Sequence, residues 1–203
     1  MKKILTFILV LFISGCTVVR IDTTSIDNIV NVILSKENTL YNRVGKGYKY
    51  YIPRGVTYID TVDLNDKLYS NGNYYYLYVD AISYYNGMEF EYEEKEDAYY
   101  SRKISPEDGF KHSGYLEITQ KDNLYYVRFV YNYAKIETMV SKENLNDAVL
   151  NSAYILSTIQ FNSDVIKLML ENEYFVNKEE KYGKFEKNQS AGNNFELQTN
   201  NNK

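Results

Sequence analysis

Short strands that alternate between two kinds of side chain, separated by tight turns, restrict the fold of this chain more than any other feature. In residues 74–82 the side chains alternate with a period of two, which is typical of a β-strand whose two faces meet different surroundings. One face carries Leu77, Val79 and Ala81, and the other carries Tyr74, Tyr76 and Tyr78. Asn71-Gly72 precedes this strand and predicts a hairpin, because both central residues of such a turn need positive φ.

Further segments follow the same pattern. Asn86-Gly87 predicts a second hairpin, followed by a half-buried strand over residues 88–93 in which glutamates alternate with apolar side chains. Residues 94–114 are polar and broken, and no strand is predicted there. The other predicted strands are residues 48–52, 56–62, 67–69, 115–121, 124–132 and 134–140. Connections this short predict an antiparallel sheet.

Three segments have the spacing of apolar side chains that is typical of one helical face. They are residues 25–36, a segment from Ser141 or Asn144 to about 159, and residues 163–173. One helix, then hairpin-linked strands, then further helices indicate an α+β fold. We therefore predict a mainly antiparallel sheet packed with about three helices.

The first sixteen residues have the order of an export signal. Lys2 and Lys3 precede an apolar run over residues 4–13, and Ser14-Gly15-Cys16 follows. A basic start, a short apolar segment and small residues before a cleavage site are the signature of a secretory signal peptide. The apolar run is too short to cross a bilayer core of about 30 Å as a permanent helix.

The segment Ile13-Ser14-Gly15-Cys16 resembles the lipobox of bacterial lipoproteins, in which the cysteine is diacylated and becomes the new N-terminus. This resemblance implies a signal peptide over residues 1–15 and an acylated tether over residues 16–24. It also implies attachment through Cys16 to a cell membrane, on its extracytoplasmic side. Two acyl chains matter here because a single chain gives only marginal binding. An ordinary signal peptide with an incidental cysteine is the alternative.

The rest of the chain suits a single α+β domain over residues 25–187. Cys16 is the only cysteine, so this domain has to be stable without disulfides. The net charge is −4. It becomes more negative if residues 1–15 are removed, and this argues against a nucleic-acid partner. Residues 188–203 are rich in asparagine and glutamine, and we expect them to be disordered.

Two segments resemble PsbP-like and DcrB-like domains at the level of fold. Residues 47–56 are similar to the opening strand of these domains, which ends in Pro-x-Gly, and residues 155–161 resemble the end of their long helix. The resemblance implies a sandwich of sheet and helices, common on exported lipoproteins. This chain departs from the pattern because it has no tryptophan after that glycine and carries an additional N-terminal helix.

The inventory of reactive side chains is small. His112 is the only histidine and lies in a polar stretch, so an ordinary surface position is the expected one. With Cys16 acylated, no thiol remains, and we expect neither a metal site nor a cofactor. The acidic run over residues 89–97 lacks the spacing of a calcium loop and is read as a solvated strand face or a protected edge.

The best candidate for a binding face is the stripe formed by Tyr74, Tyr76 and Tyr78. In solvent it would offer a rigid aromatic platform to a glycan, a peptide or a protein. Helices predicted on both sides of the strands favour a position in the core instead. We expect a non-enzymatic binding or accessory module of the cell envelope, acting with an envelope protein partner or a ligand. The alternatives are an envelope hydrolase that uses carboxylates, whose catalytic residues the sequence does not identify, and a surface protein that uses the tyrosine stripe.

Overall fold

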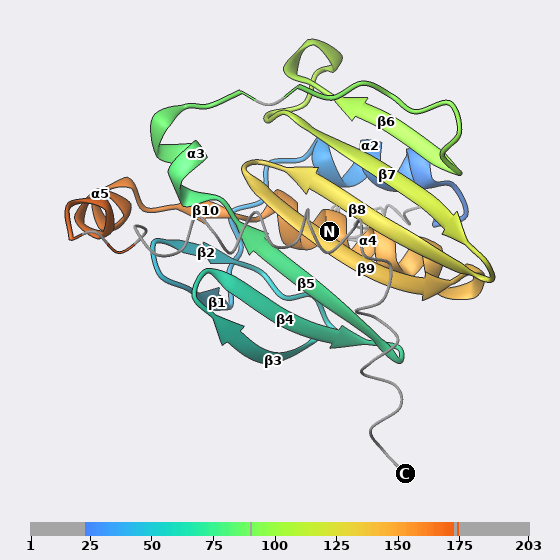
Figure 1. Ribbon diagram of the computed structural model, residues 1–203, viewed down its shortest axis with the longest axis horizontal. Helices are drawn as coiled ribbons and strands as arrows, with labels where there is room; N and C mark the ends of the chain where they lie inside the picture. The colour runs from blue at the N-terminus through green and yellow to red at the C-terminus, as the bar shows by residue number, and fades with distance from the viewer. Residues whose placement is uncertain (1–22, 90, 173, 175–203) are drawn as a thin grey trace, which may run out of the picture.

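The computed structural model describes residues 23–89, 91–172 and 174, and these form an α+β fold (Figure 1). The helices are α2 (Ile26–Leu34), α3 (Ala81–Asn86), α4 (Leu145–Ser157) and α5 (Ser163–Glu171), with 3₁₀ turns η1 (Pro106–Asp108) and η2 (Lys142–Asn144). No helix of this part of the chain is both long and apolar enough to cross a membrane. The predicted signal peptide, Cys16 and the predicted disordered tail lie outside the described residues.

Seven strands form one antiparallel sheet in the order β3-β4-β5-β9-β8-β7-β6. These strands are β3 (Thr57–Val62), β4 (Asn65–Ser70), β5 (Asn73–Val79), β6 (Tyr100–Ile104), β7 (Gly114–Lys121), β8 (Leu124–Tyr131) and β9 (Ala134–Ser141). The sheet consists of two meanders, β3–β5 and β6–β9, which meet where β5 pairs with β9. Tight turns build each meander, as at Asn71 and Gly72, whose φ angles of 48° and 82° have the sign that a two-residue hairpin needs.

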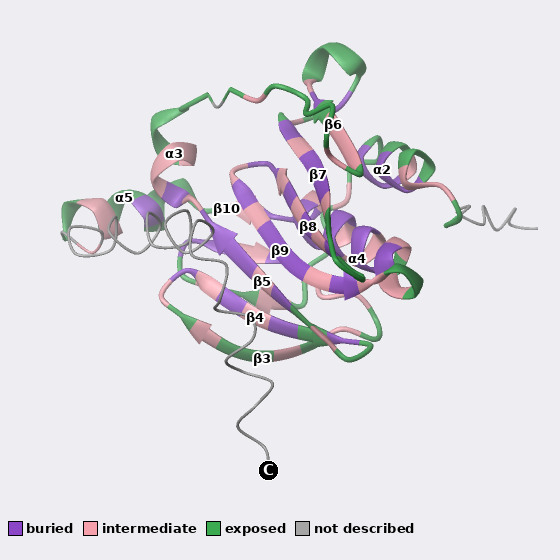
Figure 2. Ribbon diagram, turned by 45° about the vertical axis from the view of Figure 1, so that its right-hand side comes forward, coloured by how far each residue is buried: buried purple, intermediate pink, exposed green. Residues whose placement is uncertain are grey.

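One face of this sheet forms the main core. Helices α2 and α4 pack against each other, α4 also contacts β8 and β9, and both helices lie behind the sheet in Figure 1. Figure 2 shows the buried stripes of α2 and α4 and the buried residues of the central strands. Leu77, Val127, Phe129 and Ile136 are fully buried at the centre of this core. Asn132 connects the sheet to the end of α4, since its Nδ2 donates to the carbonyl of Ile159 at 2.9 Å.

A second, three-stranded sheet packs beside the first. It has the order β1-β2-β10, with β1 (Arg43–Val44), β2 (Tyr48–Tyr50) and β10 (Gln160–Phe161). Its main polar contact with the large sheet is Asp66 of β4, which is 2 % exposed. The Asp66 carboxylate accepts hydrogen bonds from Tyr50 Oη and from Thr61 Oγ1, each at 2.5 Å. Arg43 Nε lies 3.9 Å from the same carboxylate.

The structure confirms the α+β fold and most of the predicted elements. The predicted hairpin at Asn71-Gly72 joins β4 to β5, and the predicted strands over residues 115–121 and 124–132 correspond to the hairpin of β7 and β8. The first predicted helix corresponds to α2, with Ser25 as its N-cap. The remaining two predicted helices correspond to α4 and α5, and α3 is a fourth helix that the sequence analysis missed.

The predicted strand over residues 74–82 is too long at its C-terminal end, because β5 ends at Val79 and α3 follows. Asp80 is the N-cap of this helix, and its carboxylate accepts from Ser83 N at 2.9 Å and from Ser83 Oγ at 2.7 Å. Gly87 ends the helix in the left-handed conformation, with φ of 62°. The predicted hairpin at Asn86-Gly87 is therefore wrong, and its glycine is a helix C-cap.

The predicted strand over residues 88–93 is also wrong, since no strand lies between α3 and β6 among the described residues, which omit residue 90. β6 itself lies within the stretch for which no strand was predicted. It belongs to the sheet because five of its residues pair with β7, from Tyr100↔Ile118 to Ile104↔Gly114. Pairing with a strong neighbouring strand has outweighed a polar local sequence.

We predict that Asp66→Ala lowers the free energy of unfolding by about 3 kcal/mol, because Tyr50, Thr61 and Arg43 lose their common partner in a buried site. Chemical denaturation of the full-length protein followed by far-UV circular dichroism measures this loss. Asp60→Ala on the neighbouring strand is the matched control. Its exposed side chain makes a local hydrogen bond to Thr61 N, so the loss should stay near ~0.5 kcal/mol. Equal losses in both variants would contradict the role given to Asp66.

Candidate binding face of the sheet

The sheet face opposite α2 and α4 carries a continuous row of polar side chains. Residues paired across neighbouring strands share a face, so the register places one member on each of the seven strands. From β3 to β6 this transverse row is Asp60, Lys67, Tyr76, Glu137, Arg128, Glu117 and Ser101. The charges alternate along most of the row, so neighbouring side chains attract one another.

Two carboxylates of the transverse row are almost completely buried. Glu137 is 5 % exposed and Glu117 is 6 % exposed. Glu137 Oε1 lies 3.1 Å from both Arg128 Nε and Lys135 Nζ, and Glu117 Oε2 lies 2.9 Å from Lys95 Nζ. Buried charges are stable only with such partners. The row therefore fixes the side chains of this face in position.

Tyr74, Tyr76 and Tyr78 lie together on this face, as predicted, and lysines lie over their rings. Lys67 Nζ is 4.2 Å from the ring centroid of Tyr74 and 5.8 Å from that of Tyr76. Lys135 Nζ is 4.8 Å from the ring centroid of Tyr78. These distances are those of cation–π contacts. The three tyrosines thus share their face with fixed positive charges.

The exposure of the stripe changes along β5. Tyr74 is 41 % exposed, Tyr76 is half-buried, and Tyr78 is 5 % exposed. Helices were expected on both sides of the strands, but α2 and α4 both lie on the side of Leu77 (Figures 1 and 2). Among the described residues, no helix packs over the three tyrosines on this face of the sheet.

Three further tyrosines belong to this face, and the sequence analysis did not single them out. The alternation of side chains along β8 places Tyr126 on this face, on the same side as Arg128 two residues further along. The rings of Tyr92 and Tyr115 stack with centroids 3.9 Å apart and planes 5° from parallel. Tyr92 lies in the acidic stretch before β6, so only the fold brings it to the face.

Burial changes the ionisation of these tyrosines. Burial raises the pKa of Tyr92 to about 12. A hydrogen bond with Ser101 lowers this pKa, whereas the charge of Glu117 raises it further. Burial and the charge of Glu137 raise the pKa values of Tyr78 and Tyr126. All three phenols therefore stay protonated, and able to donate hydrogen bonds, to a higher pH than an exposed tyrosine does.

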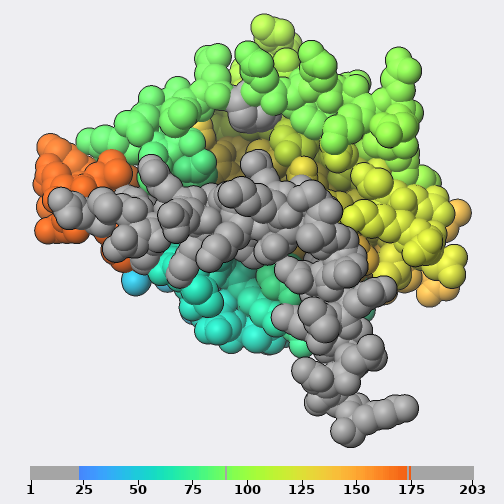
Figure 3. All heavy atoms as spheres, viewed as in Figure 1, coloured from blue at the N-terminus to red at the C-terminus, as the bar shows by residue number. Residues whose placement is uncertain are grey.

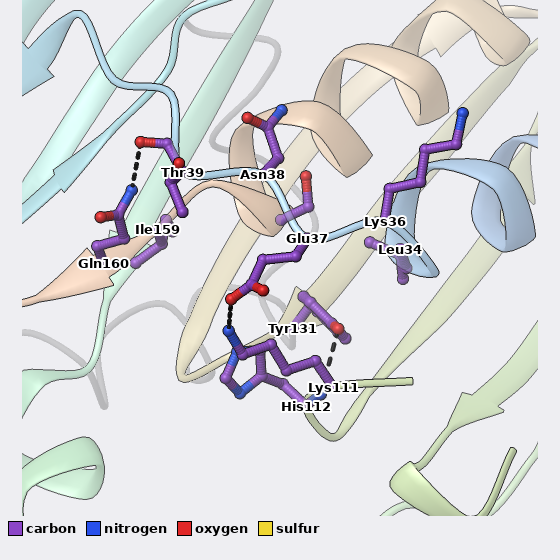
Figure 4. Close-up of a pocket in the computed structure, with 11 residues that line it drawn as sticks. Leu34, Lys36, Glu37, Asn38, Thr39, Lys111, His112, Tyr131, Ile159 and Gln160 are labelled. Atoms are coloured by element: carbon purple, nitrogen blue, oxygen red, sulfur yellow. Dashed lines mark hydrogen bonds and ion pairs between the residues drawn. The ribbon is translucent and has the colours of Figure 1, made fainter. Parts of the chain in front are cut away.

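His112 lies at a small cavity away from this face (Figure 4). The cavity has a volume of about 190 Å³ and lies between the loop after α2, the loop before β7 and the end of α4. His112 is half-buried, and burial and then the charge of Lys111 lower its pKa. Figure 4 shows Glu37 directed toward Lys111, with which it forms an ion pair. A Ser-His-Asp catalytic triad at His112 would need a serine bonded to the imidazole, whereas Ser157, which lines this cavity, donates its Oγ to the carbonyl of Tyr154 at 3.1 Å.

Individual residues within the acidic run over residues 89–97 contact the strands of the large sheet. Glu94 Oε1 accepts from Lys103 N of β6 at 2.7 Å, and Lys95 pairs with Glu117. Within the described ranges, no group of three or more histidine, cysteine, aspartate or glutamate side chains is placed to hold a metal ion. The run therefore fastens the connection between α3 and β6 to the sheet.

Comparisons of the chain with protein-family models, with curated proteins and with solved structures found no match.

We predict that the free energy of unfolding falls as the pH rises from about 10, the usual tyrosine pKa, towards 12. Because folding raises the pKa of Tyr92, its contribution is complete below pH 10 and is lost as the unfolded chain ionises first. Denaturation curves at several alkaline pH values measure this slope, and Tyr92→Phe should make it shallower. Tyr41→Phe, away from this face, controls for loss of a phenol. A slope that Tyr92→Phe leaves unchanged would contradict the burial of this phenol.

Proposed function

We propose that the mature chain is a lipoprotein anchored through diacylated Cys16 to the extracytoplasmic side of a cell membrane. Its folded part would act there as a non-enzymatic binding or accessory module of the cell envelope. The anchor is supported by Ile13-Ser14-Gly15-Cys16 and by the basic and apolar residues before it. The likeness to PsbP-like and DcrB-like domains stays a proposal about fold, compatible with a sheet covered by helices on one face.

The observation that carries the binding role is the transverse row with its tyrosines. Tyrosine and arginine supply most of the binding energy at many protein interfaces, because they combine apolar area with hydrogen bonds. Tyr76 and Arg128 lie in this row, and Glu137 and Lys67 fix their surroundings. Such pre-organised side chains lose little entropy on binding.

The dimensions of the face fit a protein partner. Seven strands about 4.8 Å apart make a sheet roughly 29 Å wide, and its three longest strands, of eight residues, are about 26 Å long. The footprint of at most roughly 750 Å² is of the same order as the ~800 Å² that one partner contributes to a stable interface, and its exposed side chains, such as Tyr74, are the ones a partner would contact. We therefore propose an envelope protein as the partner of this face.

We predict that Tyr76→Ser abolishes recovery of this partner while the protein stays folded and in the membrane. The measurement is cross-linking and co-purification from membranes of the native host, with folding checked by circular dichroism. Tyr85→Ser is the matched control, because Tyr85 is 40 % exposed on α3, away from the face. Cys16→Ser tests whether recovery needs the anchor. Recovery of the same partner with Tyr76→Ser would refute the binding face, and loss of folding would make Tyr76 a core residue.

A carboxylate hydrolase is the second candidate, and one observation favours it. Glu117 and Glu137 lie on the same face on either side of Arg128, so their Cα atoms are two strand spacings, about 10 Å, apart. Inverting glycosidases hold two carboxyl groups at roughly 6.5–9.5 Å. Both carboxylates here form ion pairs, however, and this favours structural roles.

We predict that the purified protein does not hydrolyse wall polymer, and that Glu117→Gln leaves any background rate unchanged. The measurement is the release of soluble fragments from purified cell wall, with Glu107→Gln as a control on an exposed turn. Turnover by the wild type that Glu117→Gln abolishes and Glu107→Gln preserves would establish the hydrolase instead.

A further inference from the structure

The first described residues are attached to one particular end of the fold. Asn146 Nδ2 donates to the carbonyl oxygens of Thr23 at 2.8 Å and Thr24 at 3.3 Å. Asn146 lies in the first turn of α4. The chain therefore enters the fold beside the start of this helix.

Two hairpin turns lie at the same end, which we call the entry end. The β4–β5 turn reaches the start of α4, where Asn71 Nδ2 donates to Asp147 Oδ2 at 3.4 Å. The β7–β8 turn lies beside η2, since Leu124 pairs with Ser141. In Figures 1 and 3 the yellow tip of the β7–β8 hairpin and the start of α4 lie together at the right margin. Helices α3 and α5 lie at the opposite margin in Figure 1.

The chain length between the lipid and this end is short. Thr23 lies seven positions after Cys16, and seven residues span at most about 25 Å even when extended. The seven residues of β5 alone carry the chain roughly 20 Å away from the entry end before α3 begins. Because the tether joins the fold at the entry end, this end can lie directly on the lipid, whereas placing α3 and α5 there would need most of the tether's extended length.

The surface of the entry end has the chemistry of a membrane interface. Leu124 is 42 % exposed, Tyr74 is 41 % exposed, and Tyr99 is 48 % exposed. Lys121 and Lys142 are exposed beside them, as are the carboxylates Asp122, Glu143 and Asp147. Tyrosine rings and lysine side chains are favourable at the level of lipid headgroups, where one end of the side chain is apolar and the other is hydrated.

We propose that the entry end rests on the lipid surface, with Leu124, Tyr74 and Tyr99 among the headgroups. The strands of the large sheet then run away from the membrane, and α3 and α5 are distal. This orientation rests on the proposed acylation of Cys16.

The experiment uses the absence of tryptophan from this chain, because a single introduced tryptophan is then an unambiguous reporter. Mature, lipidated Leu124→Trp and Leu168→Trp proteins are reconstituted into vesicles of phosphatidylcholine and phosphatidylglycerol that contain brominated acyl chains. Leu168 is the matched control, since it is 57 % exposed and lies on α5 at the opposite end. Tyr99→Trp is a second reporter at the entry end if Leu124→Trp fails to fold.

We expect bromine to quench the tryptophan at position 124 several-fold more strongly than the tryptophan at position 168. Equal quenching, or stronger quenching at position 168, in protein that floats with the vesicles would overturn the orientation while leaving the anchor intact. Failure of the wild-type protein to float would refute the lipid anchor itself, and the orientation with it. Flotation thus separates the failure of this inference from the failure of the proposed function.

Discussion

The pairing of β5 with β9 is the interaction on which the rest of the structure depends. It joins two meanders that are each built from local hairpins, and it connects residues about sixty positions apart, as in Tyr76↔Glu137. Because side chains alternate between faces, a shift of one residue in this register would exchange the faces of one meander relative to the other. Leu77 would then lose its place in the core opposite Ile136.

The same register determines what the opposite face contains. It places Tyr76 beside Glu137, whose ion pair with Arg128 forms across the local β8–β9 hairpin. The β5–β9 pairing thus joins the tyrosine stripe of one meander to the ion pairs of the other on this face, while it aligns Leu77 with Ile136 in the core. The buried carboxylates of this face are each stabilised by a nearby cation: Glu137 by Arg128 across the strands and by Lys135 on its own strand, and Glu117 by Lys95 from the segment before β6.

Local signals in the sequence were sufficient for the hairpin at Asn71-Gly72 and for the long helices, but not at Asn86-Gly87, where the glycine ends a helix. Asn71-Gly72 and the apolar stripe of α4 depend on residues that are close along the chain, and the structure confirms both. The prediction that β5 continues past Val79 was wrong because Asp80 is the N-cap of a helix. Asp80 lies within a run of β-forming side chains, so the sequence pattern did not indicate a helix start there. The candidate face was only partly predictable. Alternation identified its three tyrosines, but the row that crosses seven strands depends on non-local pairing, which periodicity along one strand does not contain.

The two proposals together restrict how a partner could reach this face. With the entry end on the lipid, the strands run away from the membrane. The plane of the sheet is then roughly perpendicular to the bilayer, and its face is directed toward neighbouring molecules on the same membrane. A partner that binds there would approach within the plane of the membrane, and an anchored protein would have the right height to do so. Confinement of both molecules to one surface raises their effective concentration, in the same way as a short linker between two modules. A face of tyrosines and paired charges would then need to supply less binding energy, because the membrane would provide part of the association that contacts alone would otherwise have to provide.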